Sequence, residues 1–320
     1  MIRTTDIDAL VAGARAGQAR AVARLISIVE DGSPLLPGLM DQLAEDSGRA
    51  HVIGLTGSPG VGKSTVTSAL VSAYRASGVR IGVLAIDPSS PFTGGALLGD
   101  RIRMQEHATD PGVFIRSMAS RGHLGGLAAA TPQALRVLDA AGCDVVLIET
   151  VGVGQSEVEI AAAADTTIVI VAPGMGDGIQ AAKAGILEIG DIFVVNKADR
   201  DGAASTARDL RQMLTLSDRA EDEWTPPVLQ TVASSSQGID ELVASINAHR
   251  AWLDQSERLR VRRIQRARAE ITALALGGVQ ARLLAPDSPI ASLAEQVVDG
   301  RMSPHAAARV LSAQVALHPA

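Results

Sequence analysis

Short apolar runs alternate with longer stretches of helical spacing through the middle of the chain. Runs of four to eight apolar residues favour buried strands, and apolar side chains three or four residues apart favour helices. The apolar runs predict strands at 51–56, 79–86, 113–116, 143–149, 166–172, 191–196 and 227–232. The helical patterns lie near 64–77, 125–141, 177–189, 203–216 and 238–254. Strand–helix alternation is typical of βαβ units, so we expect an α/β fold with a mainly parallel sheet flanked by helices.

Both ends of the chain show helical patterns only. Residues 6–30 place apolar side chains at helical spacing and predict one helix, which the sequence Asp31-Gly32-Ser33-Pro34 ends. Helical patterns return after residue 251 and again around 288–317. We therefore expect a helical N-terminal segment (1–48), an α/β domain (49–254) and a C-terminal helical arm (255–320).

Composition and charge narrow the class of protein. Apolar residues make up 47% of the chain but aromatic residues only 2%, so Ala, Val, Leu and Ile must build the core, as in buried parallel sheets. The net charge of −6 argues against a general nucleic-acid binder. No apolar run reaches the ~18–20 residues of a membrane span, and the first residues lack the apolar centre of a signal peptide. With a single cysteine, Cys143, we expect a cytoplasmic protein.

A phosphate-binding loop follows the first predicted strand. The sequence Gly57-Ser-Pro-Gly-Val-Gly-Lys-Ser64 matches G-x-x-x-x-G-K-[ST], with a strand before it and a helix after it. Backbone N–H groups would face the phosphates, Lys63 would reach the β- and γ-phosphates, and the Ser64 hydroxyl would bind Mg²⁺. The eight matched positions disfavour an ordinary glycine-rich turn. The candidate nucleotide-binding residues are Gly57, Ser58, Pro59, Gly60, Val61, Gly62, Lys63, Ser64 and Thr65.

A guanine-binding motif ends the sixth predicted strand, in the sequence Asn196-Lys197-Ala-Asp199. The Asp199 carboxylate can accept hydrogen bonds from N1–H and the exocyclic amine of guanine, whereas adenine offers neither donor there. The stem of Lys197 can lie along the base, and Asn196 can tie this loop to the phosphate loop. The alternative for Asp199 is a helix cap.

A third element that contacts the base is expected after the strand 227–232. GTPases usually have Ser-Ala at this point, and this chain has Val232-Ala233. The missing serine weakens the assignment. The backbone N–H of Ala233 or Ser234 could still contact guanine O6, and Ser235 is a further candidate nucleotide-binding residue.

Acidic residues at or just beyond strand ends are candidate ligands of Mg²⁺. They are Asp87, Asp100 and Glu149. Glu149 ends an apolar strand, the place of a Walker-B carboxylate, and Asp87 and Glu149 join Lys63 as candidate catalytic residues. The alternative for each acid is a solvated loop charge or a cap.

The loop after Glu149 bears on the rate of hydrolysis. Gly152 could offer its N–H to the γ-phosphate and so sense hydrolysis. The next residue is Val153, where Ras-like enzymes hold a glutamine that orients water, and a valine side chain cannot do so. We expect slow hydrolysis of GTP to GDP and phosphate, which a partner or loop closure accelerates.

Five blocks together resemble the methylmalonyl-CoA mutase-associated GTPases, a SIMIBI-class family with members once labelled arginine/ornithine transport kinases. The blocks are GSPGVGKST, DPSSPFTGGALLGDRIRM, ETVGVGQSE, GDGIQAAKAGILEIGDIFVVNKAD and GRMSPHAAARVL. The resemblance covers nearly the whole chain. It implies a P-loop GTPase chaperone that docks on an adenosylcobalamin-dependent acyl-CoA mutase, methylmalonyl-CoA mutase above all. There it would gate cofactor loading and protect or reactivate the mutase.

The resemblance also implies roles for individual residues. Those matching Lys63, Ser64, Asp87, Asp100 and Glu149 would serve GTP and Mg²⁺. The loop with Gly174, Asp177 and Lys183 would act as an extra switch toward the mutase. The C-terminal arm would make a homodimer, which suits residues 257–270, where six arginines flank an apolar stripe.

Three alternatives remain open. A metal-chaperone GTPase of the same class would need Cys/His clusters, and one cysteine with scattered histidines does not supply them. A transport-linked nucleotide-dependent kinase would use ATP, against which Asp199 argues. A GTP-binding structural module would lack turnover, so phosphate release distinguishes it.

Overall fold

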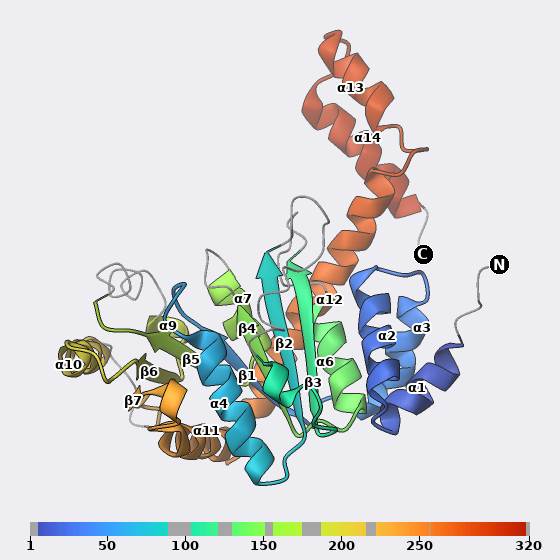
Figure 1. Ribbon diagram of the computed structural model, residues 1–320. Helices are drawn as coiled ribbons and strands as arrows, with labels where there is room; N and C mark the ends of the chain where they lie inside the picture. The colour runs from blue at the N-terminus through green and yellow to red at the C-terminus, as the bar shows by residue number, and fades with distance from the viewer. Residues whose placement is uncertain are drawn as a thin grey trace. The chain divides into compact units, whose positions relative to one another are not determined.

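A seven-stranded sheet lies at the centre of the fold, with the strand order β3-β2-β4-β1-β5-β6-β7 (Figure 1). Every neighbouring pair of these strands is parallel. The predicted α/β fold is therefore confirmed, and each predicted strand is present. The strands are β1 (His51–Thr56), β2 (Ile81–Pro88), β3 (Val113–Ser120), β4 (Val145–Thr150), β5 (Thr166–Val171), β6 (Ile192–Asn196) and β7 (Val228–Thr231).

The computed structural model describes residues 6–88, 104–120, 130–150, 156–174, 187–215, 222–255 and 257–317. The chain forms two compact units, Met1–Arg266 and Ala267–Ala320. Among the described residues, no helix has the length and apolar character needed to cross a membrane. The short helices of the first unit are η1 (Ala44–Asp46), η2 (Gln105–His107), α9 (Leu187–Ile189) and η4 (Ala233–Ser235).

Helices cover both faces of the sheet. On one face, α4 (Lys63–Ala76) and α11 (Ile239–Asp254) share a buried cluster with alternate residues of the central strands. On the other face lie α6 (Thr131–Ala140), α7 (Ser156–Ala163) and α10 (Ala203–Thr215). Because side chains alternate between the faces of a strand, a strand covered on both faces is buried at every position and is mainly apolar. This explains why β1, β5 and β6 are buried along their whole length.

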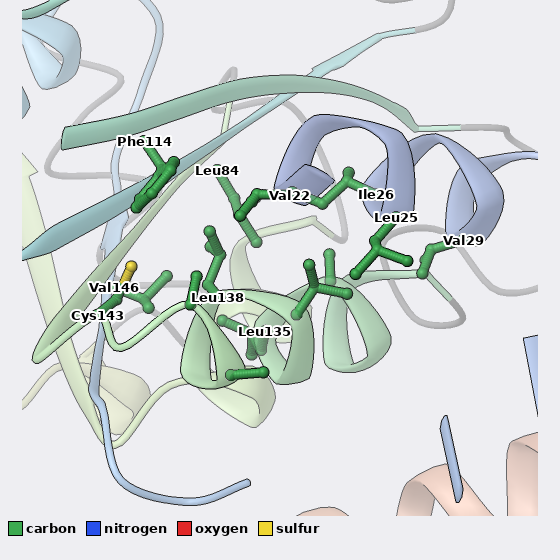
Figure 2. Close-up of a cluster of buried hydrophobic side chains, with 14 of the residues drawn as sticks. Val22, Leu25, Ile26, Val29, Leu84, Phe114, Leu135, Leu138, Cys143 and Val146 are labelled. Carbon is green, nitrogen blue, oxygen red and sulfur yellow. The ribbon is translucent and has the colours of Figure 1, made fainter. Parts of the chain in front are cut away.

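The N-terminal segment adds a further helical layer beside α6. It contains α1 (Ile7–Arg15), α2 (Ala19–Glu30) and α3 (Leu36–Leu43), and α2 lies against α6 and β3. Figure 2 shows the apolar side chains that join α2, α6 and the sheet in one buried cluster. The labelled members are Val22, Leu25, Ile26, Val29, Leu84, Phe114, Leu135, Leu138, Cys143 and Val146.

The single helix predicted over residues 6–30 is wrong, because the chain turns between α1 and α2. Gly17 has φ 71°, in the left-handed region. Its N–H donates to Ala14 O at 2.8 Å, and the N–H of Gln18 donates to Gly13 O at 2.9 Å. This pair of bonds is a Schellman motif, which ends a helix at a left-handed glycine. The apolar spacing continues across the turn, so spacing alone hides the break.

The C-terminal part contains α12 (Arg258–Leu283), α13 (Ile290–Val298) and α14 (Pro304–Leu317). The helical character predicted for both stretches is confirmed. Within the second unit, α13 and α14 pack against each other, and a turn with Gly300 at φ 70° separates them. The last predicted stretch is therefore two helices.

Two aspartates anchor the beginning of α12 to the sheet within the first unit. Asp165, which precedes β5, is fully buried and accepts hydrogen bonds from Arg263 at 2.8 Å and Arg266 at 2.6 Å. Asp191, which precedes β6, accepts two bonds from Arg262, at 2.8 and 3.0 Å. We call these five residues the aspartate–arginine anchor. Because an unpaired buried charge is costly, each aspartate depends on its guanidinium partners.

Two buried histidines flank Thr166 next to this anchor. The Thr166 hydroxyl lies 2.8 Å from His51 Nε2 and 2.9 Å from His249 Nδ1. Burial lowers the pKa of His51 to about 4, against the opposing charge of Asp165. Burial likewise lowers the pKa of His249 to about 4, although Asp191 pulls in the opposite direction. The Asp191 carboxylate already accepts two bonds from Arg262, so the imidazole remains neutral.

Acid should destabilise the protein in the pH range between about 6.5 and 4. The unfolded chain protonates these histidines below about pH 6.5, whereas the folded chain does so only near pH 4, so protons favour unfolding in between. Each shift corresponds to about 3 kcal/mol of unfolding free energy. Urea unfolding followed by circular dichroism across this range measures the loss.

His305, an exposed histidine on α14, offers a matched control for that measurement. The change His249→Gln should flatten the dependence of unfolding free energy on pH, and His305→Gln should leave it unchanged. Equal slopes for the wild type and His249→Gln would contradict the assignment.

Candidate guanine-nucleotide site

The phosphate loop connects β1 to α4 and is shaped by close contacts at its glycines. Gly57 has φ 143°, and a Cβ at this position would lie 2.1 Å from the carbonyl oxygen of Ile170 in β5. Gly62 has φ 96°, and a Cβ there would lie 2.4 Å from Asn196 Nδ2. Only glycine fits such contacts in the left-handed region. The loop is therefore held against both β5 and the end of β6.

Lys63 begins α4 and turns its ammonium group back into the loop. Its side chain is buried, and Nζ donates to the carbonyl oxygens of Gly57 at 2.7 Å and Ser58 at 3.1 Å. The positive end of the α4 dipole lies at the same place. A buried ammonium group and a helix N-terminus together favour an anion such as a phosphate.

The loop after β6 is bonded directly to the phosphate loop. Asn196 Nδ2 donates to Val61 O at 2.9 Å, so the tie expected of this side chain is present. Lys197 has φ 59°, and its Nζ donates to Gly60 O at 2.6 Å. The two motifs therefore form one structure, although they lie more than 130 residues apart in sequence.

Asn196 also holds the loop after β7. Its Oδ1 accepts from Thr231 Oγ1 at 3.1 Å and from the N–H of Ala233 at 3.2 Å. The N–H of Ser235 donates to Val232 O at 3.0 Å. Of the two backbone N–H groups predicted to contact guanine O6, that of Ala233 is donated to Asn196, and Ser234 is the remaining candidate.

A cavity of about 160 Å³ lies between these loops and the start of α4. Residues from the phosphate loop, from the loop after β6 and from the loop after β7 line it together. They are Gly62, Thr65, Asn196, Lys197, Asp199, Arg200, Val232, Ala233 and Ser234. The exposed Asp199 carboxylate is at this cavity, as the base-binding prediction requires.

A second group of polar side chains lies where β4 ends beside α4. Glu149 is 3% exposed. Its Oε1 accepts from Ser64 Oγ at 2.6 Å, and its Oε2 accepts from Thr67 Oγ1 at 3.0 Å. Two of the predicted metal ligands, Ser64 and Glu149, are thus in contact. Hydroxyl and carboxylate oxygens are the donors that Mg²⁺ takes in proteins.

The comparisons with known proteins agree with this geometry. A family model described as Methylmalonyl Co-A mutase-associated GTPase MeaB matches residues 22–287. The chain belongs to this family. The resemblance found in the sequence blocks is therefore confirmed.

Relatives of this MeaB-family chain align over most of its length. A protein of Pyrococcus horikoshii is 46% identical over 304 residues, which cover 94% of this chain and 96% of that protein. GTPase ArgK of Escherichia coli is 37% identical over 274 residues, which cover 83% of each chain. The crystal structure of a LAO/AO transport system kinase covers 98% of this chain and 99% of its own, with 28% identity and a TM-score of 0.72. The fold is that of a P-loop GTPase.

The other predicted site residues of this MeaB-family chain lie at the edges of the described ranges or outside them. Asp87 belongs to β2, next to β4 in the sheet, but its side chain lies outside the described residues. Gly174 follows β5 with φ 78°. Among the residues that the structure describes, no group of three or more His, Cys, Asp and Glu could hold a metal ion. The predicted residues outside the described ranges are Asp100, Gly152, Asp177 and Lys183.

Sequence reasoning missed Thr67, which is fully buried and bonded to Glu149. A signal was available, because Thr67 lies three residues after Ser64 and so one helical turn along the same face of α4. It also missed Thr231, whose bond to Asn196 links the loops after β6 and β7.

Proposed function

We propose that this MeaB-family protein binds GTP with Mg²⁺ and hydrolyses it slowly, as a chaperone of an adenosylcobalamin-dependent acyl-CoA mutase. The family description favours methylmalonyl-CoA mutase as the partner. The protein would gate cofactor loading and protect or reactivate the mutase. The observation that carries the nucleotide part is the bonding of Asn196 and Lys197 to the phosphate-loop carbonyls.

We assign the phosphates of the nucleotide to the phosphate loop and its base to the cavity. Residues 57–65 hold the phosphates, and Lys63 exchanges its bonds with Gly57 and Ser58 for phosphate oxygens. Asp199 binds the N1–H and amine of guanine, and the stem of Lys197 lies along the base. Ser234 is the group we assign to guanine O6, because the N–H of Ala233 is donated to Asn196.

The residues at the end of β4 fit a magnesium ion. Ser64 and Glu149 bring a hydroxyl and a carboxylate within 2.6 Å of each other, and both are donors suited to Mg²⁺. We assign these two as ligands, directly or through water, together with Asp87 and Asp100. The ion, when bound, would neutralise charge on the phosphates. Lys63, Asp87 and Glu149 would support hydrolysis, and Gly152 would sense the γ-phosphate.

Communication with the mutase and dimerisation complete the proposal. The loop with Gly174, Asp177 and Lys183 would report the nucleotide state to the mutase. The arm at 255–320 would form a homodimer, for which the second unit offers exposed apolar side chains on α12, such as Ile271 at 66% and Leu276 at 64% exposure. The helical segment 1–48, the G domain 49–254 and the arm would act together in the cytoplasm.

Affinity capture from native cells should retrieve a cobalamin-dependent mutase with this protein in the presence of a guanine nucleotide. Purified protein should release inorganic phosphate from GTP slowly, and the captured mutase should raise that rate. Adding ATP instead of GTP is the matched control, because adenine lacks the donors that Asp199 binds.

Three results would contradict all or part of the proposal. Transfer of phosphate onto a transport protein, rather than its release, would favour a transport-linked kinase. Tight GTP binding without any release would favour a structural module. Affinity capture that repeatedly retrieves no mutase would contradict the proposed chaperone role but not the proposed GTPase activity.

A further inference from the structure

Both carboxylate oxygens of Glu149 are bonded from the same helix. Ser64 and Thr67 lie three residues apart on α4, so their side chains lie one turn apart on one face. Ser64 Oγ donates to Oε1 at 2.6 Å, and Thr67 Oγ1 donates to Oε2 at 3.0 Å. Two fixed oxygens leave the carboxylate a single orientation.

The Thr67 hydroxyl has two acceptors within reach but only one hydrogen to donate. It lies 3.0 Å from Lys63 O, the usual bond of a helical threonine to the preceding turn, and 3.0 Å from Glu149 Oε2. A buried carboxylate is the stronger acceptor, because hydrogen bonds to charged groups are about twice as strong as neutral ones. The Thr67 hydroxyl therefore donates its hydrogen to Glu149 rather than to Lys63 O.

We propose that Thr67 is a positioning residue for the magnesium site, which it serves by orienting Glu149. This inference rests on the proposed function. With Oε2 held by Thr67, Oε1 stays in place to accept the Ser64 hydrogen. The lone pairs of the Ser64 oxygen then face away from Glu149, where they would be available to a bound Mg²⁺. Without Thr67 the carboxylate rotates, and the Ser64 hydroxyl loses its fixed acceptor.

The change Thr67→Val tests this, because valine keeps the shape of threonine and removes the hydroxyl. The probe is N-methylanthraniloyl-GDP, whose dissociation rate is measured by fluorescence over a range of Mg²⁺ concentrations and in EDTA. We expect Thr67→Val to need about 10-fold to 100-fold more Mg²⁺ to slow release, the loss typical of residues that orient metal ligands. Release in EDTA should match the wild type, and Thr67→Ser should restore the normal Mg²⁺ dependence.

Thr206 on α10 provides a matched control. It is also buried and also bonds the carbonyl four residues earlier, with Oγ1 3.0 Å from Gly202 O. Thr206→Val should therefore keep the wild-type Mg²⁺ dependence. In the Glu149→Ala background, Thr67→Val should add no further shift, because the two changes remove the same interaction.

Each outcome has a distinct meaning. A wild-type Mg²⁺ dependence in Thr67→Val overturns the inference, as does an equal acceleration of release in EDTA, which would indicate a packing defect alone. A full additional shift in the Glu149→Ala background also overturns it. If Thr67→Val folds poorly, Thr67→Ala, which also lacks the hydroxyl, takes its place with the same expected result. Wild-type protein that binds no guanine nucleotide would instead overturn the proposed function itself.

Discussion

Replacing Lys63 by alanine should abolish GTP turnover while the protein remains folded. The Lys63 ammonium group is buried inside the curve of the phosphate loop, where two carbonyl oxygens hold it. Because charge builds on the phosphate oxygens during transfer, loss of one such donor costs about 10²–10³-fold in rate. Phosphate release and binding of a fluorescent GTP analogue measure the effect, and circular dichroism checks the fold.

The variant Lys63→Arg provides a demanding control. It keeps the positive charge, but the planar guanidinium group is bulkier than an ammonium group. Because the loop bonds the ammonium group at 2.7 and 3.1 Å, we expect arginine to restore little of the activity. A folded Lys63→Ala protein with wild-type turnover would show that this loop does not act on phosphates.

Replacing Asp199 by asparagine should shift the nucleotide preference from GTP toward xanthosine triphosphate. Asp199 is at the cavity that the phosphate loop and the two base loops enclose. Asparagine presents an amide donor where guanine also donates, whereas xanthine has an oxygen that accepts. Loss of two bonds to a charged group costs about 3 kcal/mol or more, which is on the order of 10²-fold in affinity. Competition binding of the two nucleotides measures the change.

Asp201 is a suitable control for this experiment, because it is an exposed aspartate two residues further along the same loop. Asp201→Asn changes the net charge equally and should leave the guanine preference intact. If Asp199→Asn and Asp201→Asn behave alike, the carboxylate that reads the base lies elsewhere.

Most of the sheet was predictable because its strands are buried on both faces. In β5 the residues 168–171 are buried throughout and read as an uninterrupted apolar segment after the two buried threonines. The nucleotide loops were predictable for a different reason. Glycines at fixed spacing mark positions where the backbone has a positive φ or approaches another chain segment closely. Gly57 and Gly62 leave no room for a Cβ, and this requirement is visible in the sequence itself.

Contacts between distant residues were not predictable in the same way. Asp165 and Arg263 are 98 residues apart, and neither belongs to a spacing pattern. The arginines at 257–270 therefore indicated only a basic face on a dimerising arm, although Arg262, Arg263 and Arg266 bind buried aspartates. The Gly17 turn shows the opposite case, where a local signal is present but continuing apolar spacing conceals it.

The aspartate–arginine anchor decides where the α/β unit ends as a self-sufficient piece of polypeptide. A fragment that stops at Asp254, the last residue of α11, has all seven strands yet lacks the three arginines that bond Asp165 and Asp191, and it keeps for Asp165 the looser contact with Arg250 at 3.9 Å. Removing one partner of a buried ion pair costs about 3–5 kcal/mol, so loss of the arginines that bond Asp191 and Asp165 takes away a large fraction of the stability of a domain. A fragment that runs on to Arg266 keeps both carboxylates neutralised. All strands of the sheet thus lie before residue 254, but the arginines that bond its two buried aspartates lie at 262–266.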